Sequence, residues 1–161
     1  MTVEEYNQSV DLYANNIYRF IVKNLRDNNF ANDIVQDTFE KLWINLANVT
    51  GSKVKSYLFT VAYHTMINYV RKMRRLEYHD ELPISSGYVE GGYDNLQEIL
   101  HEAVNKLSPV QRSVIMLRDY EGYSYDEISE ITGLNESQVK VYIYRARMYL
   151  KNYIGRLEMV I

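Results

Sequence analysis

Apolar residues recur at three- and four-residue steps through residues 1–76, which is the spacing of one face of an α-helix. The stripe of the first segment consists of Val10, Ala14, Ile17, Ile21 and Leu25. Thr2 followed by Glu5 forms a capping-box pair, which satisfies two free N–H groups where a helix begins. No strand-like alternation of apolar and polar residues is present. The pattern predicts helices at 3–26, 31–48 and 54–76.

Polar and glycine-containing segments separate these three predicted helices. The cluster Asp27-Asn28-Asn29 is expected to end the first helix, and a loop containing Gly51 is expected at 48–52. The inward face of the second predicted helix consists of Val35, Phe39, Leu42 and Leu46. We interpret Trp43, like Phe39, as a core residue.

Four helix-start pairs occur in the second half of the chain. In each pair a capping residue precedes a Glu or Gln by three positions, so that side chains satisfy free N–H groups at the helix start. The pairs are Asp94 with Gln97, Ser108 with Gln111, Ser124 with Glu127, and Asn135 with Gln138. They predict helices at 95–107, 109–120, 125–132 and 136–153. The fold class that follows is all-α.

Segment 79–93 lies between the two sets of helices and contains one proline and three glycines among acidic residues and serines, the composition of a linker. Charge is also divided along the chain, although the net charge is only −3. Residues 53–76 carry only basic charges, residues 77–103 only acidic ones, and residues 136–156 are again mostly basic. Such blocks of like charge say more about the binding partners of a protein than its net charge does. Ordinary solvated faces are the alternative for each block.

Composition excludes several classes of protein. The chain has no cysteine, so it has no disulfide framework, thiolate metal site or cysteine nucleophile, and it fits a reducing cytoplasm. Its three histidines share no ligand spacing, and no nucleotide-binding or nucleophile motif occurs. Nothing resembles a signal peptide or a membrane span. We therefore expect a cytoplasmic protein that is not an enzyme, with no metal, no cofactor and no membrane insertion.

Residues 125–145 fit a helix-turn-helix. Gly133 permits a left-handed turn and Leu134 fills the corner, while Thr132 stands where such motifs more often have an aliphatic residue. Val139, Ile143, Ala146 and Leu150 form the inward face of the second helix. The opposite face is expected to contact the major groove and phosphates of DNA. A helical hairpin with a basic surface is the alternative.

Three segments resemble the extracytoplasmic-function class of RNA polymerase sigma factors of the sigma-70 family. They are NDIVQDTFEKLW at 32–43, VKSYLFTVAYHTMINYVRKMRR at 54–75, and LSPVQRSVIMLRDYEGYSYDEISEITGLNESQVKVYIYRARMYL at 107–150. The resemblance implies a region 2-like bundle at 1–76, an acidic linker at 77–93 and a region 4-like helix-turn-helix domain at 94–161. Two helical domains joined by a flexible linker are thus expected.

The resemblance also implies roles for surface residues. The polymerase-binding candidates are Asp33, Gln36 and Asp37. The minus-10 candidates, for phosphates and unstacked bases, are Lys53, Lys55, Tyr63, His64, Asn68, Arg71, Lys72, Arg74 and Arg75. The minus-35 candidates are Glu136, Ser137, Gln138, Lys140, Val141, Tyr144, Arg145, Arg147 and Lys151. A flipped base is expected in the loop 47–53.

The match has departures and leaves alternatives. Tyr57 stands where the family usually has Trp, and His64 and Asn68 replace the commoner Asn and Asp, which affects individual base contacts. Tyr63 either stacks on a base or packs on a neighbouring helix. The expected partners are core RNA polymerase, double-stranded and melted promoter DNA, and, as is usual in the family, an anti-sigma factor. The rival hypothesis is a free-standing helix-turn-helix regulator with an N-terminal dimerisation or sensing domain.

Overall fold

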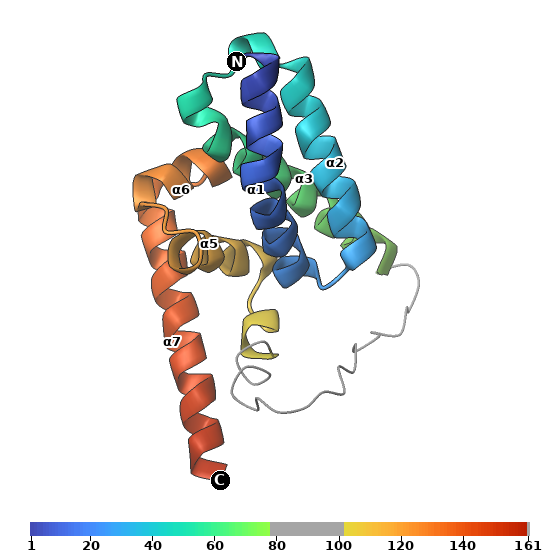
Figure 1. The fold of residues 1–161 in the computed structure, drawn as a ribbon. Helices are drawn as coiled ribbons and strands as arrows, with labels where there is room; N and C mark the ends of the chain where they lie inside the picture. The colour runs from blue at the N-terminus through green and yellow to red at the C-terminus, as the bar shows by residue number, and fades with distance from the viewer. Residues whose placement is uncertain (78–101, 161) are drawn as a thin grey trace.

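Capping side chains begin the first two helices of the N-terminal half. The computed structural model describes the backbone of residues 1–77 and 102–160 and the side chains of residues 1–73 and 102–155. Helix α1, Val3–Leu25, begins at the predicted Thr2–Glu5 capping box. Helices α2, Asn28–Ile44, and α3, Val54–Glu77, complete the bundle (Figure 1).

The break between α1 and α2 is shorter than predicted. Only two residues separate the helices: Arg26 has a left-handed φ of 53°, and Asp27 is the N-cap of α2. The Asp27 carboxylate accepts a hydrogen bond from the backbone N–H of Phe30 at 3.0 Å. The expectation that Asn28 and Asn29 would stay outside a helix was wrong, because the preceding carboxylate supplies the cap that lets both join α2.

Trp43 lies on the surface, so the prediction that it is a core residue was also wrong. Leu42 is fully buried, and consecutive helical residues point about 100° apart, which turns Trp43 away from the core. The Trp43 side chain is 50% exposed and its ring meets the Tyr6 ring edge-on at 5.1 Å. Phe39 is buried as predicted. Helix α2 ends at Ile44, earlier than expected.

Two short 3-10 turns, Leu46–Asn48 and Gly51–Lys53, connect α2 to α3. Between them Val49 is buried in the core. The segment predicted to be a loop is therefore partly ordered by its own turns. It positions Lys53 at the start of α3.

Three helices of the C-terminal half begin at the positions that the capping pairs predicted. They are α5, Pro109–Asp119, α6, Tyr125–Thr132, and α7, Glu136–Val160. Ser124 forms a capping box with Glu127, and Asn135 and Gln138 bond each other's backbone N–H groups at 3.0 and 2.8 Å. Residues 102–105 are helical, as predicted. The predicted Asp94–Gln97 cap and the 79–93 linker lie outside the described residues.

The turn between α6 and α7 has the expected glycine. Gly133 has a φ of 78°, the left-handed conformation that glycine adopts without steric cost. The buried Thr132 hydroxyl donates to the carbonyl of Ile128 at 2.7 Å and accepts from the N–H of Leu134 at 3.3 Å. Thr132 thus bonds backbone groups at the end of α6, which an aliphatic side chain could not do.

Thr132→Val is expected to lower the free energy of unfolding by about 1–2 kcal/mol, because it removes a buried hydrogen-bonding group. Urea unfolding followed by circular dichroism measures the change. Ser137→Ala, at an exposed position on α7, serves as the control and should stay within about 0.5 kcal/mol of the parent chain. Equal stability of Thr132→Val and the parent would contradict this role for the hydroxyl.

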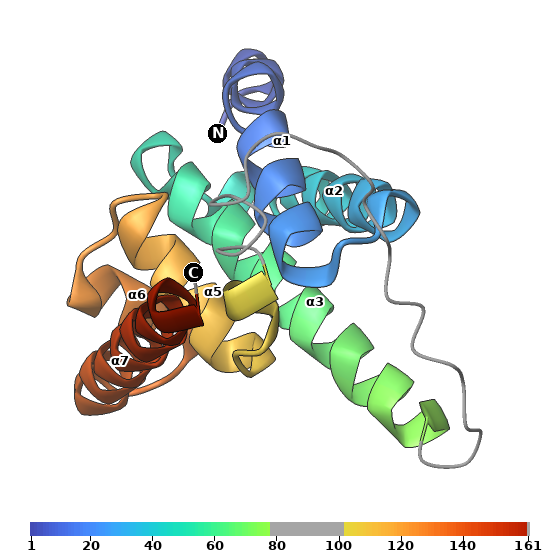
Figure 2. The same cartoon turned by 90° about the horizontal axis from the view of Figure 1, so that it is seen from below.

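The two halves of the chain pack against each other mainly along α3, one side of which contacts α1 and α2 while the other contacts α5 and α6. Figure 2 shows α3 running between the pair α1 and α2 and the helices α5 and α6. Phe59 of α3 contacts the Phe20 ring at 5.5 Å and the Tyr123 ring at 5.6 Å, both edge-on. Buried residues of both halves therefore form one continuous core.

Polar contacts also join α1 to α5. The buried Asn24 side chain accepts a hydrogen bond from the Ser113 hydroxyl at 3.2 Å, and its backbone carbonyl accepts one from the Arg112 guanidinium. At the edge of the junction the Lys23 ammonium lies 4.0 Å above the centre of the exposed Tyr120 ring. The described structure is thus a closed arrangement of the two halves.

Candidate nucleic-acid and polymerase interfaces

Helix α7 presents two opposite faces. Val139, Ile143 and Ala146 are buried against α5 and α6, as the apolar stripe predicted. All nine minus-35 candidates on α7 are exposed. No residue that the structure describes covers this face, so a duplex could reach it, while the role of each residue stays a prediction.

Several polar side chains on this face already have partners. The Gln138 amide oxygen accepts from the Asn135 backbone N–H in the helix cap. Lys140 lies 3.6 Å from the Glu136 carboxylate and 5.8 Å from the centre of the Tyr125 ring. Exposed pairs of this kind are weak, so DNA could displace the Lys140 contacts more easily than the cap.

Arg147 is held at the edge of α7 by α5. Its guanidinium donates a hydrogen bond to the Asp119 carboxylate at 2.7 Å, and this bond raises the pKa of Arg147 above its usual value. Both side chains remain about half exposed. The pair fixes the direction of a cation that lies beside the predicted DNA-binding face.

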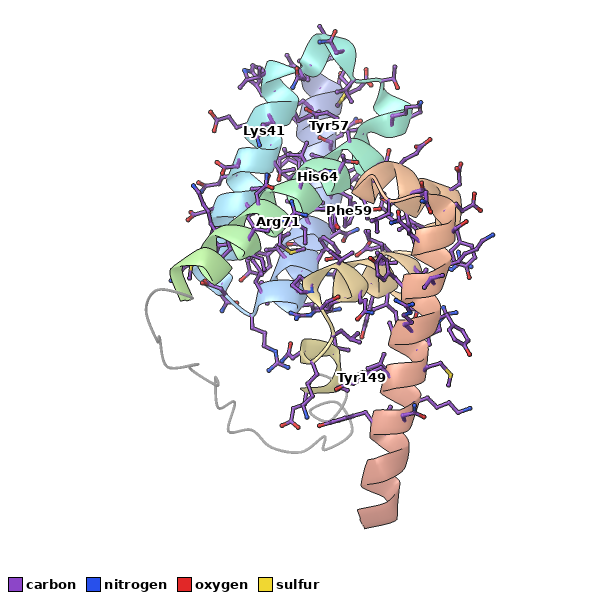
Figure 3. All side chains as sticks on the ribbon, turned by 180° about the vertical axis from the view of Figure 1, so that it is seen from behind. Lys41, Tyr57, Phe59, His64, Arg71 and Tyr149 are labelled. Carbon is purple, nitrogen blue, oxygen red and sulfur yellow. The ribbon has the colours of Figure 1, made fainter. Side chains whose placement is uncertain are left out.

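Four minus-10 candidates lie along one exposed stripe of α3. They are His64, Asn68, Arg71 and Lys72. Asn68, Arg71 and Lys72 also line a pocket of about 540 Å³, whose other walls are Thr65 and the stacked rings of Phe30 and Tyr69. Figure 3 shows His64 and Arg71 in order along α3. The side chains of Arg74 and Arg75 lie outside the described residues.

Lys55 and Tyr63 do not belong to that stripe. Tyr63 is only 4% exposed, so of the two predicted roles, stacking on a base or packing on a neighbouring helix, the structure favours packing. This burial raises the pKa of its phenol. The Lys55 ammonium lies 5.1 Å from the centre of the Tyr123 ring, in the C-terminal half. The closed arrangement thus covers part of the predicted minus-10 segment.

Tyr57 has a structural partner at the end of α2. Its hydroxyl accepts a hydrogen bond from the Asn45 amide at 3.0 Å. The tyrosine that replaces the family's usual tryptophan therefore links α3 to the segment that follows α2. Lys53, at the end of that segment, is exposed.

The polymerase-binding candidates lie along an exposed edge of α2. Asp33, Gln36 and Asp37 all face solvent. Positions 33, 37, 40 and 44 follow one line on a helix, and the line ends at Ile44, which is 71% exposed. We call the edge formed by Asp33, Gln36, Asp37, Glu40, Trp43 and Ile44 the α2 edge. Sequence reasoning missed its apolar end because it placed Trp43 in the core.

The part of the chain that the structure describes contains no cluster of His, Cys, Asp or Glu able to hold a metal ion. Within the same residues no helix is long and apolar enough to cross a membrane. The three surfaces described above, on α7, on α3 and along the α2 edge, are the features that remain for functional interpretation.

The fold is all-helical, and the second helix of its helix-turn-helix exposes a basic face. These features place the chain in the class of helix-turn-helix DNA-binding proteins. Family models narrow the class: residues 10–76 match "Sigma-70 region 2" and residues 97–150 match "Sigma-70, region 4". Together with the relatives reported next, these matches show that the chain belongs to the extracytoplasmic-function (ECF) RNA polymerase sigma factors. It is a transcription initiation factor that acts with RNA polymerase.

Individual relatives agree with this assignment. The chain is 30% identical to the ECF RNA polymerase sigma factor SigM of Bacillus subtilis, over 97% of each chain. It is 32% identical to RNA polymerase sigma factor YlaC of the same organism, over 86% of each. Among solved structures, the sigma factor RpoE in complex with the anti-sigma factor NepR from Bartonella quintana matches with a TM-score of 0.80 and 28% identity, over 95% of this chain and 98% of that one.

Proposed function

We propose that this sigma factor recognises the minus-35 element with α7 and the minus-10 element with α3, and that it docks on core polymerase through the α2 edge. The observation that carries the proposal is the exposed face of α7. This face lies opposite the buried apolar residues of the helix and contains the basic residues of the helix-turn-helix. A helix with this division fits the major groove. Catalysis would belong to the polymerase, and the factor would work where the polymerase does, in the cytoplasm.

The α2 edge has the chemistry of a protein interface. Acidic residues at Asp33 and Asp37 supply charge, while Trp43 and Ile44 supply exposed apolar area at one end. Tryptophan is over-represented among residues that contribute most to binding energy. The edge lies on the side of α2 that faces away from the core, so a partner could reach it in the closed arrangement.

The closed arrangement must open when both promoter elements are bound. About 25 base pairs separate the two elements, which is about 85 Å of duplex at 3.4 Å per base pair. Helices α3 and α6 are in direct contact, and α3, with 24 residues, is only about 36 Å long. We therefore infer that the described structure is a closed state and that docking on polymerase separates the halves.

An anti-sigma factor is part of the proposal as a partner. The RpoE chain with which this structure shares its fold was solved in complex with an anti-sigma factor. Such a partner would act here by keeping the halves together. The free-standing regulator is not favoured, because the N-terminal half matches sigma region 2 and not a separate dimerisation domain.

The acidic segment 77–103 lies mostly outside the described residues, so its role stays a hypothesis. It carries seven acidic residues and no Lys or Arg. By resemblance the segment would pass through basic channels of polymerase and imitate nucleic acid there, and a simple solubilising spacer is the alternative. The contacts suggested for it in the free protein, with Arg71, Lys72, Arg145 and Arg147, are hypotheses of the same kind.

Transcription in vitro tests the proposed function directly. Core polymerase and the full chain are incubated with fragmented genomic DNA, and transcript starts are mapped. Starts that depend on the chain and share sequence motifs centred near −10 and −35 support the proposal. Transcription unchanged by the chain, or failure of the chain to co-elute with core polymerase, would refute it.

Arg147→Ala and Lys151→Ala are expected to weaken holoenzyme binding at all minus-35 sequences alike, because both residues lie beyond the first turns of α7 and should hold phosphates. Each loss should lower the log–log slope of affinity against salt by about one. Titrations at several salt concentrations on two different promoters measure both effects. A defect confined to one promoter sequence would assign the residue to base recognition instead.

A further inference from the structure

The outward side of α7 has an apolar centre and charged borders. Ser137, Val141, Tyr144 and Met148 follow each other at steps of four, three and four residues. The inward line Val139, Ile143, Ala146 and Leu150, of which the first three are buried and Leu150 is partly buried, has the same steps and is displaced by two residues. Two residues correspond to about 200° around a helix, so the first line lies directly opposite the core.

Three of these four side chains expose apolar surface. The exposed fractions are 43% for Val141, 66% for Tyr144 and 40% for Met148. Cations border the line: Lys140, Arg147 and Lys151 on one side and Arg145 on the other, all exposed. This arrangement places phosphate-binding groups at the rims and an apolar strip where a major groove would be deepest.

The polar candidates near the start of α7 are less available for base edges. Gln138 and Asn135 satisfy each other's backbone N–H groups at 3.0 and 2.8 Å, so breaking this cap would cost stability. Glu136 and Lys140 are paired at 3.6 Å. Val141 is the sixth residue of α7, within the N-terminal part of a recognition helix that reaches base edges.

The floor of the major groove offers one apolar group, the 5-methyl of thymine. We propose that Val141 makes apolar contact with a thymine methyl of the minus-35 element and thereby sets the base preference at that position. The inference rests on the proposed function and adds to it the chemical group that is recognised. Tyr144 and Met148 continue the same strip toward the edge of the groove.

Replacing thymine by deoxyuracil tests the contact, because it removes the methyl and leaves the hydrogen-bonding groups of the base pair unchanged. A minus-35 duplex is first selected from a randomised library by holoenzyme made of the full chain and core polymerase. Each thymine is then replaced in turn, and the affinity is measured for the parent chain and for Val141→Ala. Val141 is exposed, and Ala is the better helix former, so the variant keeps the fold.

At one thymine, loss of the methyl should lower the affinity of the parent holoenzyme about fourfold, which is the effect expected when one methyl-sized apolar group is no longer buried. Val141→Ala should not distinguish the two bases there. Met148→Ala, about 10 Å further along the helix, should keep the parent's discrimination at that thymine. The inference is overturned if no thymine shows a difference, or if the difference persists in Val141→Ala. Failure to form holoenzyme or to select any minus-35 sequence would instead refute the proposed function, and the inference with it.

Discussion

Reversal of Asp33 and Asp37 to Lys is expected to weaken binding to core RNA polymerase by at least about 100-fold. Both carboxylates lie on the exposed α2 edge, where no contact within the described residues requires them for folding. Loss of one partner from a close interfacial charge pair costs about 2–5 kcal/mol, and reversal adds repulsion. Fluorescence anisotropy of the labelled chain, titrated with core polymerase, measures the change.

A charge-matched control separates a specific interface from net charge. Asp11→Lys with Glu130→Lys makes the same change in charge at exposed positions on α1 and α6, and it should retain affinity for polymerase. Trp43→Ala tests the apolar end of the α2 edge and should weaken binding by about tenfold or more. Normal affinity of the Asp33→Lys, Asp37→Lys chain would place the docking surface elsewhere.

Locking the two halves together is expected to abolish promoter-dependent transcription. The chain has no cysteine, so cysteines introduced for Lys23 and Tyr120 are the only reactive thiols. These side chains meet at the junction of α1 and α5, with 4.0 Å between the Lys23 ammonium and the ring centre. A short bismaleimide that contains a disulfide would hold the closed arrangement, in which the two DNA-binding surfaces cannot span about 85 Å.

Transcription should fall to background after cross-linking and return when the spacer disulfide is reduced. The two single-cysteine variants, treated with the same reagent, control for modification alone and should transcribe normally. Because the α2 edge is exposed in the closed arrangement, the locked chain should still contact core polymerase through this edge, even though its halves cannot separate. Undiminished transcription by the cross-linked chain would show that the closed arrangement is compatible with initiation.

The features that the sequence predicted correctly depend on interactions between residues that are close together in the chain. Three helix starts of the C-terminal half follow cap pairs three residues apart, and the turn of the helix-turn-helix follows a glycine at φ 78°. The inward and outward faces of α7 follow from helical periodicity alone. These features depend on residues within one or two turns of each other, and such residues are already neighbours in the sequence.

The sequence by itself determined that the chain is helical, where most helices begin, and which family it belongs to. Only the tertiary structure decided that Trp43 is exposed while Tyr63 is buried, because both outcomes depend on which helix packs on each face. Helix α3 is covered on two sides, by α1 and α2 and by α5 and α6. A stripe of apolar residues specifies that a face is buried, but its partner can lie far along the chain, as Tyr123 does for Phe59, and periodicity carries no information about it.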